Sequence, residues 1–373
     1  MNISAEKMHN SYLSVELELL RQNIRAASAS LSVGAKIIPV LKCDAYGLGI
    51  ERVAKAIEGM DEVCMPAVAH VSEGLDLRRC GIKKPILVLN HPIPTALGAA
   101  AEAGLTLTVG RLGLLPQLSA LGIPFSVQLK LDTGLHRVGV AVGDELSSLL
   151  SELRACGDAV TLTGVFSHFA DTADAQRCAA QYALYMRGVE QIEAAGFSVP
   201  MRHICDSAAS ENYPEYHLDA VRLGRRLMMD HPTAPRGDIR ECASWHCFVT
   251  GITQRHAGDT LGYADAYRLE KDATVAILSV GYGDGLPIPL VEAHGSVLLR
   301  GRRCPLLACC MDQCFIDVTG TEAAIGDEVT VFGRDDLGNE LTAQEQSAVF
   351  GGNEGCGITS MLSCRVARVY SDR

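Results

Sequence analysis

The chain has 373 residues, of which 48% are hydrophobic, a proportion typical of a globular protein with room for two domains. Its 33 basic and 44 acidic residues give a net charge of −11 without a dense Lys/Arg block, so a nucleic acid is not an expected partner. No apolar run reaches the ~20 residues of a membrane-spanning helix, and the N-terminus lacks a signal-peptide core, so we expect a cytoplasmic chain.

From about residue 35 to about residue 225, short apolar runs alternate with longer amphipathic segments that end in glycine. The apolar runs predict eight strands, at 36–42, 62–69, 85–90, 105–110, 125–132, 162–169, 202–206 and 220–224. Helical patterns lie between them, for example at 71–80, 144–156 and 176–195. Eight such alternations favour an α/β fold of the (β/α)8 TIM-barrel type, although a doubly wound sheet alternates in the same way.

After about residue 241 the sequence changes to short β-branched runs that are separated by Gly and Asp turns. The runs at 274–280, 295–299, 315–318 and 328–332 predict strands. We therefore predict a barrel domain over 15–240 and a mostly β C-terminal domain over 241–373.

Lys42 stands where the first predicted strand opens onto a turn that contains Gly47 and Gly49. In a barrel, the carboxyl ends of the strands form the face on which active sites are built. A partly desolvated amine at this face loses its proton more readily and can form a Schiff base with a carbonyl group. The alternative is an ordinary surface lysine at the end of a strand.

Six sequence blocks resemble those of the alanine racemase family, whose members bind pyridoxal 5′-phosphate. The blocks are Lys42-Cys43-Asp44-Ala45-Tyr46-Gly47-Leu48-Gly49, 129–139, 166–170, 221–224, 281–285 and 310–313. Six blocks in the family's order, over nearly the whole chain, are far more specific than one. The resemblance implies a cofactor-binding barrel and a β domain that the N-terminal residues 1–14 join.

By this resemblance, Lys42 forms the covalent link to the cofactor and acts as acid or base on one face of the substrate Cα. Tyr263, in Leu261-Gly262-Tyr263-Ala264, matches the catalytic tyrosine on the opposite face. Racemisation needs two such groups, because a proton leaves one side of a planar carbon and returns to the other. A tyrosine with its usual pKa of ~10 needs nearby cations to do this. Taken alone, Tyr263 would be a half-buried strand tyrosine.

The resemblance also implies how the cofactor ring is held. Arg222 matches the arginine that faces the pyridine nitrogen, and a guanidinium group can only donate to that atom. This weakens the ring as an electron sink and limits side reactions. His168 and His203 match histidines that stack on the ring and support the arginine, although a lone histidine on a strand is commonly structural.

Other matching residues surround the cofactor's phosphate and phenolic oxygen. Tyr46, Ser207 and the backbone at Gly224 match the family's phosphate contacts, and Ser207 also has the pattern of a helix N-cap. Arg137 matches the arginine near the phenolic oxygen and the substrate. Lys130 matches a lysine that is carbamylated in many members and orients this arginine.

Met311 and Asp312 resemble substrate-side residues that the family presents from the partner subunit, beside Tyr263. The resemblance therefore implies a homodimer with shared active sites, in which the β domain of one chain completes the site of the other. A monomer is expected to be inactive.

Asn353 stands before Glu354, where the family commonly has a tyrosine. Loss of a phenol opens space, and a carboxamide offers a donor and an acceptor to a serine hydroxyl group. The substitution resembles the serine racemase domains of vancomycin-resistance proteins, the VanT type, which are fused to a membrane domain. We therefore expect a serine and alanine racemase that supplies D-serine for cell-wall precursors, as the cytoplasmic part of a membrane-anchored protein. Arg225 stands where an apolar residue is usual.

Three alternatives to this expectation share part of the pattern. An ordinary alanine racemase, which supplies D-alanine for the cell wall, would have the same motifs. A non-catalytic pyridoxal-phosphate carrier shares the barrel and the lysine but lacks the second β domain. A fold-related amino-acid decarboxylase has a different C-terminal signature, which this chain does not show.

The 14 cysteines are scattered, and none forms a Cys-x-x-Cys pair. Cys304, Cys309, Cys310 and Cys314 lie close together in the sequence, but no histidine follows at ligand spacing. We interpret the cysteines as reduced core residues in a cytosolic setting, and we expect no metal site.

Overall fold

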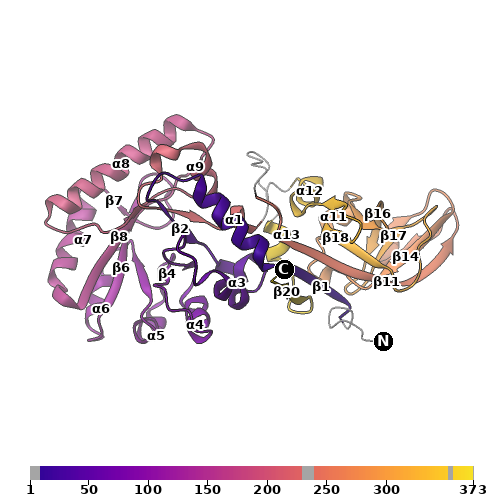
Figure 1. The fold of residues 1–373 in the computed structure, drawn as a ribbon, viewed down its shortest axis with the longest axis horizontal. Helices are drawn as coiled ribbons and strands as arrows, with labels where there is room; N and C mark the ends of the chain where they lie inside the picture. Colours follow the sequence, from indigo (N-terminus) through magenta and orange to yellow (C-terminus); the bar gives the residue numbers. More distant parts are fainter. Residues whose placement is uncertain (1–8, 229–238, 352–355, 373) are drawn as a thin grey trace. The chain divides into compact units, whose positions relative to one another are not determined.

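The computed structural model describes residues 9–228, 239–351 and 356–372, and the chain divides into two compact units (Figure 1). The unit called here the barrel unit contains Ile24–Ala45 and Ile50–Leu227. The unit called the β unit contains Met1–Asn23, Tyr46–Gly49 and Met228–Arg373. The family-like barrel residues thus lie in the first unit, apart from the short segment that follows Lys42.

Eight short parallel strands form the centre of the barrel unit. They are β2 (Lys36–Pro39), β3 (Ala67–Val68), β4 (Leu87–Val88), β5 (Thr106–Val109), β6 (Phe125–Asp132), β8 (Val160–Phe166), β9 (Arg202–His203) and β10 (Ala220–Leu223). The strands from β3 to β9 pair in order, and β10 pairs with β2. Two parallel bridges, Ile37 to Val63 and Val40 to Ala67, join the β2 segment to the β3 segment. A hydrogen bond from Arg222 N–H to the Cys205 carbonyl joins β10 to the segment that follows β9. The sheet closes, which confirms the (β/α)8 prediction over the doubly wound alternative.

The helices of the barrel lie outside the strands (Figure 1). In chain order they are α1 (Leu17–Ala29), which begins in the β unit, α3 (Ile50–Ile57), α4 (Val71–Arg79), α5 (Leu97–Glu102), α6 (Leu114–Ser119), α7 (Asp144–Ala155), α8 (Ala175–Ala194), α9 (Ser207–Asn212) and α10 (Arg225–Met228). The helix α7 shows why they pack this way, because Leu146, Leu149, Leu150 and Leu153 form one buried face at helical spacing. The helices expected at 71–80, 144–156 and 176–195 are present as α4, α7 and α8.

The β unit contains one nine-stranded sheet. Its strands are β1 (Ser11–Glu16), β11 (Ala243–Arg255), β14 (Ala273–Leu278), β15 (Ser296–Leu299), β16 (Arg302–Cys309), β17 (Cys314–Asp317), β18 (Glu328–Arg334), β19 (Glu340–Leu341) and β20 (Ala367–Ser371). The sheet order is β19-β18-β15-β16-β17-β14-β11-β1-β20, and β18 also pairs with β11. The N-terminal strand β1 thus lies between β11 and β20. The predicted mostly β C-terminal domain is confirmed.

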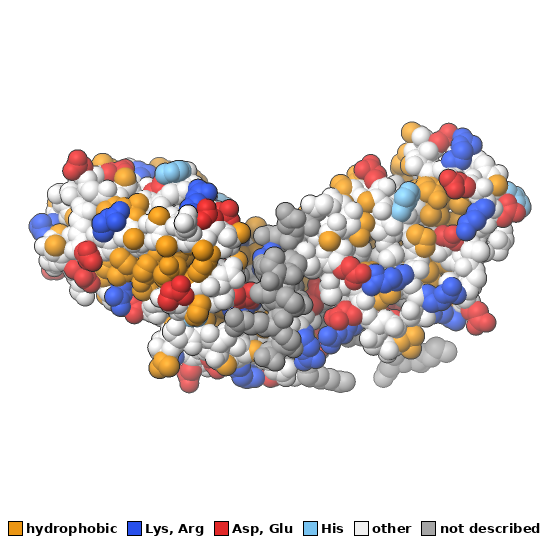
Figure 2. Space-filling model, turned by 90° about the horizontal axis from the view of Figure 1, so that it is seen from above, with side chains coloured by type: hydrophobic (Ala, Val, Ile, Leu, Met, Phe, Trp, Pro, Cys, Tyr) orange, Lys and Arg blue, Asp and Glu red, His pale blue; other side chains and the backbone are white. Residues whose placement is uncertain are grey.

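Short elements complete the two units. They are β7 (Val140–Ala141), which pairs with β6, the hairpin of β12 (Thr260–Leu261) and β13 (Tyr267–Arg268), and the helices α11 (Ile288–Glu292), α12 (Ala343–Val349) and α13 (Cys356–Ser360). Lys and Arg side chains are interspersed with Asp and Glu side chains on the face that Figure 2 shows. Among the described residues, no helix is long and apolar enough to cross a membrane, and every described cysteine thiol is free.

Candidate active site

Lys42 opens a left-handed turn instead of ending a strand. The strand β2 ends at Pro39, and Val40 adds one parallel bridge to Ala67. The predicted strand over 36–42 is therefore wrong for its last two residues, Leu41 and Lys42. Lys42 is the first residue of α2 (Lys42–Tyr46), and Cys43, Asp44 and Ala45 have φ values of 53–56°. Left-handed conformation costs an ordinary residue about 1–2 kcal/mol, so other interactions must hold this turn.

The side chain of Glu73 holds the start of the turn. Its Oε1 atom accepts a hydrogen bond from Cys43 N–H at 2.7 Å. Its Oε2 atom accepts from Ala69 N–H at 2.8 Å and His70 N–H at 3.0 Å, at the beginning of α4. The peptide N–H of Cys43 adjoins Lys42, so Glu73 fixes the peptide group that carries the lysine. Glu73 is not among the predicted site residues, although a Glu at the third position of a helix is a known capping pattern.

Arg222 on β10 is buried and surrounded by hydrogen-bond acceptors. Its Nη1 atom donates to His203 Nδ1 at 2.8 Å, and its Nη2 atom donates to His168 Nδ1 at 2.9 Å. The carbonyl oxygens of Ser167 and Ile204 also lie within hydrogen-bond distance of Nη2, so its two N–H groups are shared among three acceptors. Burial lowers the pKa of Arg222 to about 10, so the guanidinium group keeps its charge at neutral pH. In the described part of the chain, Nη1 has one acceptor for its two N–H groups, so one N–H can donate to a ligand.

Both histidines beside Arg222 are neutral. Burial, followed by the positive charge of Arg222, lowers the pKa of His168 and of His203 well below the ordinary value. Because the guanidinium group only donates, each histidine must present an unprotonated Nδ1 atom to it. The Nε2 atom of His203 then carries the proton and donates to Gln128 Oε1 at 2.8 Å. The Nε2 atom of His168 lies 3.6 Å from Asp206 Oδ2.

Lys130 lies inside the barrel beside this cluster. It is buried on β6, and its Nζ atom lies 4.5 Å from the centre of the Phe166 ring. Burial, followed by the charges of Arg222 and Arg137, lowers the pKa of Lys130 well below the ordinary value. Arg137 is exposed in the loop after β6, and its charge also acts on His168, as does that of Lys42. The structure therefore brings together the predicted barrel residues Lys42, Lys130, Arg137, His168, His203 and Arg222.

The predicted phosphate contacts lie next to helices α9 and α10. Ser207 is the first residue of α9, but the N-cap is Asp206, whose side chain accepts from Ala209 N–H at 2.9 Å. The prediction that Ser207 caps this helix is therefore wrong, because Ser207 is already inside the helix and Asp206, the residue before it, accepts the capping hydrogen bond. Gly224 is buried immediately before α10, and Arg225, which is half-buried, begins that helix.

Tyr46 continues the left-handed turn with a φ of 55°, and its side chain is half-buried. The next residue, Gly47, has a φ of 87°, and a Cβ atom there would clash with the backbone carbonyl group of Thr359. The carbonyl oxygen of Gly47 accepts a hydrogen bond from Arg368 Nε at 3.0 Å. The positive φ and the clash of a Cβ atom with Thr359 both require a glycine at this position of the motif.

The remaining predicted residues belong to the β unit. The Tyr263 side chain is 74% exposed in a 3₁₀ turn, so it is not a half-buried strand tyrosine. Met311, which is 54% exposed, and Asp312 form the tip of the β16–β17 hairpin. Gly283 N–H donates to the Met311 carbonyl at 2.7 Å and fixes that tip. Asn353 lies outside the described residues.

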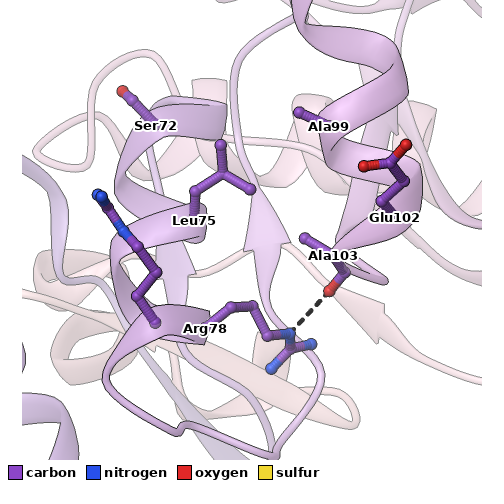
Figure 3. Close-up of a pocket in the computed structure, with 7 residues that line it drawn as sticks. Ser72, Leu75, Arg78, Ala99, Glu102 and Ala103 are labelled. Carbon is purple, nitrogen blue, oxygen red and sulfur yellow. Dashed lines mark hydrogen bonds between the residues drawn. The ribbon is translucent and has the colours of Figure 1, made fainter.

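A pocket on the outside of the barrel lies between α4 and α5 (Figure 3). It is lined by Ser72, Leu75, Arg78, Arg79, Ala99, Glu102 and Ala103. Arg78 faces the Ala103 carbonyl there, and its Nε atom donates to that oxygen at 2.9 Å. None of the predicted site residues lines this pocket, and Arg78 has a structural role in joining the ends of the two helices.

The neutral state of His203 makes the stability of the fold depend on pH. Its pKa is lowered in the folded chain, so below about pH 6.5 the unfolded chain binds a proton that the folded chain excludes. His203 therefore makes its full contribution to the unfolding free energy above this pH. Each pH unit below it lowers the unfolding free energy by about 1.4 kcal/mol until the pKa of His203 in the folded chain is reached.

We expect wild-type protein to lose more unfolding free energy between pH 7.5 and pH 5.5 than a His203→Gln variant, as measured by urea unfolding. His256 is exposed, so His256→Gln is a matched control that should keep the wild-type pH dependence. An unchanged pH dependence in His203→Gln would contradict the assignment of a neutral His203.

The donor set at this end of the barrel fits pyridoxal phosphate. Lys42 supplies a primary amine for the aldehyde carbon, and the remaining Nη1 N–H of Arg222 suits an unprotonated pyridine nitrogen. Neutral histidines and carbonyl oxygens surround Arg222, and among the described residues no carboxylate contacts the guanidinium group directly. The site therefore favours an acceptor atom on the ligand.

Two family models match the chain. The model for the alanine racemase N-terminal domain matches residues 15–232, and the model for the alanine racemase C-terminal domain matches residues 242–370. The alanine racemase of Desulfovibrio desulfuricans is 33% identical over 95% of this chain and 96% of the relative. The alanine racemase of Methanococcus maripaludis is 30% identical over 97% of this chain and 99% of the relative.

Solved structures agree with these matches. The crystal structure of the alanine racemase from Bacillus anthracis with bound L-Ala-P has a TM-score of 0.90 and 27% identity, over 97% of this chain and 95% of that chain. The structure of the alanine racemase from Streptomyces coelicolor has a TM-score of 0.90 and 26% identity, over 99% of this chain and 100% of that chain. The chain therefore belongs to the alanine racemase family, and pyridoxal phosphate is its cofactor.

Proposed function

We propose that this chain interconverts L- and D-alanine with pyridoxal phosphate. The observation that carries the proposal is the cluster of Arg222 with two neutral histidines at the end of the barrel that also presents Lys42. The relatives that cover nearly the whole chain are alanine racemases, and this favours alanine over the serine preference expected from Asn353.

The bound cofactor supplies an electron sink that makes the substrate Cα–H acidic. We assign Lys42 to hold the cofactor covalently and to move a proton at one face of Cα, and Tyr263 to move a proton at the other face. Arg222 donates to the pyridine nitrogen and leaves it without a proton, because guanidinium does not release one near neutral pH. This restrains the electron sink and favours simple proton return to Cα.

We assign further contacts on the same basis. Tyr46, Ser207 and the backbone at Gly224 bind the phosphate, and His168 supports the ring. Arg137 faces the phenolic oxygen and the substrate carboxylate, and Lys130 orients Arg137. The lowered pKa of Lys130 supports this role, since a neutral buried amine is the form that reacts with carbon dioxide to give a carbamate.

A homodimer with shared active sites is part of the proposal. Several large side chains of the β unit are exposed, and they include Tyr263, Met311 and Tyr282, which is 38% exposed. Exposed apolar side chains of this kind suit a protein interface. In the proposed dimer, Tyr263, Met311 and Asp312 of one chain complete the site formed by Lys42 and Arg222 of its partner.

The test is to incubate the cofactor-loaded protein with L-alanine and with L-serine and to follow circular dichroism. We expect the signal of L-alanine to decay to zero as both enantiomers reach equal concentrations. If cofactor is bound and neither amino acid loses its optical activity, a non-catalytic carrier replaces the racemase.

Serine is a second candidate substrate, and its support is the sequence at Asn353. Asn353→Tyr restores the family's usual phenol, which fills the space for a hydroxymethyl group and removes its hydrogen-bond partner. We expect the serine-to-alanine ratio of kcat/KM to fall by about tenfold or more. An unchanged ratio would show that Asn353 does not select the substrate, and the link to VanT-type proteins with a membrane domain would lose its basis.

A further inference from the structure

Gln128 is a buried polar residue on the strand that also carries Lys130. Gln128 is 1% exposed. It lies two positions before Lys130 on β6, so both side chains are on the same face of the strand and point to the barrel interior. Gln128 Oε1 lies 2.8 Å from His203 Nε2. Gln128 Nε2 faces two sulfur atoms, Met65 Sδ at 3.7 Å and Met201 Sδ at 3.9 Å, which are weak acceptors.

The direction of the hydrogen bonds along this chain of side chains follows from Arg222. Because Arg222 Nη1 can only donate, His203 must accept at Nδ1, and its single proton must lie on Nε2. The neighbour of Nε2 must then be an acceptor, which is the carbonyl oxygen of Gln128. With the opposite orientation of the amide, its NH₂ group would face the Nε2–H of His203, and moving the ring proton to Nδ1 would only shift the clash to the N–H of Arg222.

Packing confines both the amide and the imidazole ring. The His203 ring stacks on Phe166 with a centroid distance of 4.9 Å and an interplanar angle of 10°. Gly164 on β8 leaves room for the glutamine, because a Cβ atom there would lie 3.0 Å from Gln128 Nε2 and 2.8 Å from the Met201 carbonyl oxygen. The amide therefore has a fixed place beside the ring.

We propose that Gln128 is a positioning residue of the racemase, because it holds His203 in the Nε2–H tautomer and thereby directs the His203 lone pair at Arg222. The guanidinium group is then fixed where it meets the cofactor ring nitrogen. This last step rests on the proposed function, whereas the tautomer of His203 does not. Arg222 and Lys130 are the titratable groups that act on His203, and Arg222 is cationic whereas burial lowers the pKa of Lys130 well below the ordinary value. Neither stabilises a second proton on His203, so a neutral acceptor at residue 128 keeps the ring neutral.

Glutamate and leucine at residue 128 would act in different ways. A carboxylate would stabilise a second proton on His203, and the resulting Nδ1–H would point at the N–H of Arg222. Leucine would remove the acceptor, so that both tautomers of His203 become accessible. The wild-type amide is the side chain that accepts a hydrogen bond without adding a charge.

The first measurement is ¹⁵N NMR of histidine in the cofactor-free protein, with His203 assigned from the signal lost in His203→Gln. We expect the Nε2–H tautomer in the wild type, a mixture of tautomers in Gln128→Leu, and protonation of both ring nitrogens in Gln128→Glu. Gln346→Leu removes another buried glutamine, in the β unit, and should leave the His203 signals unchanged. An Nδ1–H tautomer in the wild type overturns the proposal, whether or not the variants fold.

The second measurement is made on the cofactor-loaded protein. We expect both Gln128 variants to shift the absorption band of bound cofactor and to lower kcat for alanine by about tenfold, while Gln346→Leu does neither. If the tautomer changes but the band and kcat do not, Gln128 has a structural role only and the proposal fails. If His203 has the expected tautomer in the wild type and changes as expected in the Gln128 variants, but the wild type does not racemise alanine, the hydrogen-bond chain stands and the proposed function fails.

Discussion

A Lys42→Ala variant is expected to lose racemisation of L-alanine, with kcat lowered by about 10³-fold or more. Two functions disappear together, because the same amine links the cofactor and moves the proton at one face of Cα. The left-handed turn that begins at Lys42 places this amine, and alanine keeps the backbone but removes the reacting group. Circular dichroism of the amino acid measures the rate, and the absorption spectrum of the protein shows whether the cofactor is still linked.

Lys36 is the matched control for this variant. It is the first residue of β2, the strand that precedes Lys42, and its Nζ atom donates to the Asp61 carbonyl at 2.9 Å. Lys36→Ala removes the same amount of side chain from an exposed position, so we expect near wild-type activity. A Lys42→Ala enzyme that racemises alanine as fast as Lys36→Ala would exclude Lys42 as the catalytic amine.

The barrel could be predicted because its strands are short apolar runs that are separated by amphipathic helices. The strand β5 is buried at every position, and β6 is buried at all but two, as a strand covered on both faces should be. The site residues could be placed because closure of a barrel brings the carboxyl ends of its strands together. His168 and Arg222 are 54 positions apart in the sequence, yet they share a hydrogen bond.

The turn after Lys42 could not be predicted from local sequence. Of Cys43, Asp44 and Ala45, only the aspartate is a residue type enriched at positive φ, and three such residues in a row are not expected from local preference. The interaction that holds the start of the turn comes from Glu73, thirty positions away from Cys43. Tertiary contacts overcame the local preference here. Gln128 had a weaker signal, because polar and apolar residues alternate along β6, and a face with Ser126, Gln128, Lys130 and Asp132 has the pattern of a solvent-exposed face. The structure buries Gln128 and Lys130 on that face.

The β unit was less predictable in detail. The strand β11 has 13 residues with a mixed polar pattern, and it pairs with β1 in a regular register and with β14 and β18 through register shifts. A strand that changes partners along its length does not keep one alternating face, so its hydrophobic pattern is weak. The strands β16 and β20 were not predicted, because β16 begins with two arginines and contains a proline, and β20 is short with an arginine among its five half-buried residues.

A Tyr263→Phe variant should lose racemisation but keep part of the proton chemistry. Phenylalanine keeps the ring of this exposed side chain and removes only the hydroxyl group. Proton transfer then fails at the face of Cα that Tyr263 serves, while Lys42 still acts at the other face. We expect one enantiomer of alanine to exchange its Cα proton for deuterium in D₂O without inversion, and the other enantiomer to exchange far more slowly. Tyr282→Phe changes another exposed tyrosine of the same unit and should leave both processes intact.

The two inactive variants together test whether the site is shared. In a mixture of Lys42→Ala and Tyr263→Phe chains, half of the randomly formed dimers are mixed. If Lys42 of one chain works with Tyr263 of its partner, each mixed dimer has one site with both groups intact, so roughly a quarter of wild-type activity returns. If both groups act within one chain, every chain in the mixture lacks one of them, and no activity returns. Recovery on mixing, measured after refolding the two chains together, therefore separates a shared site from a site within one chain.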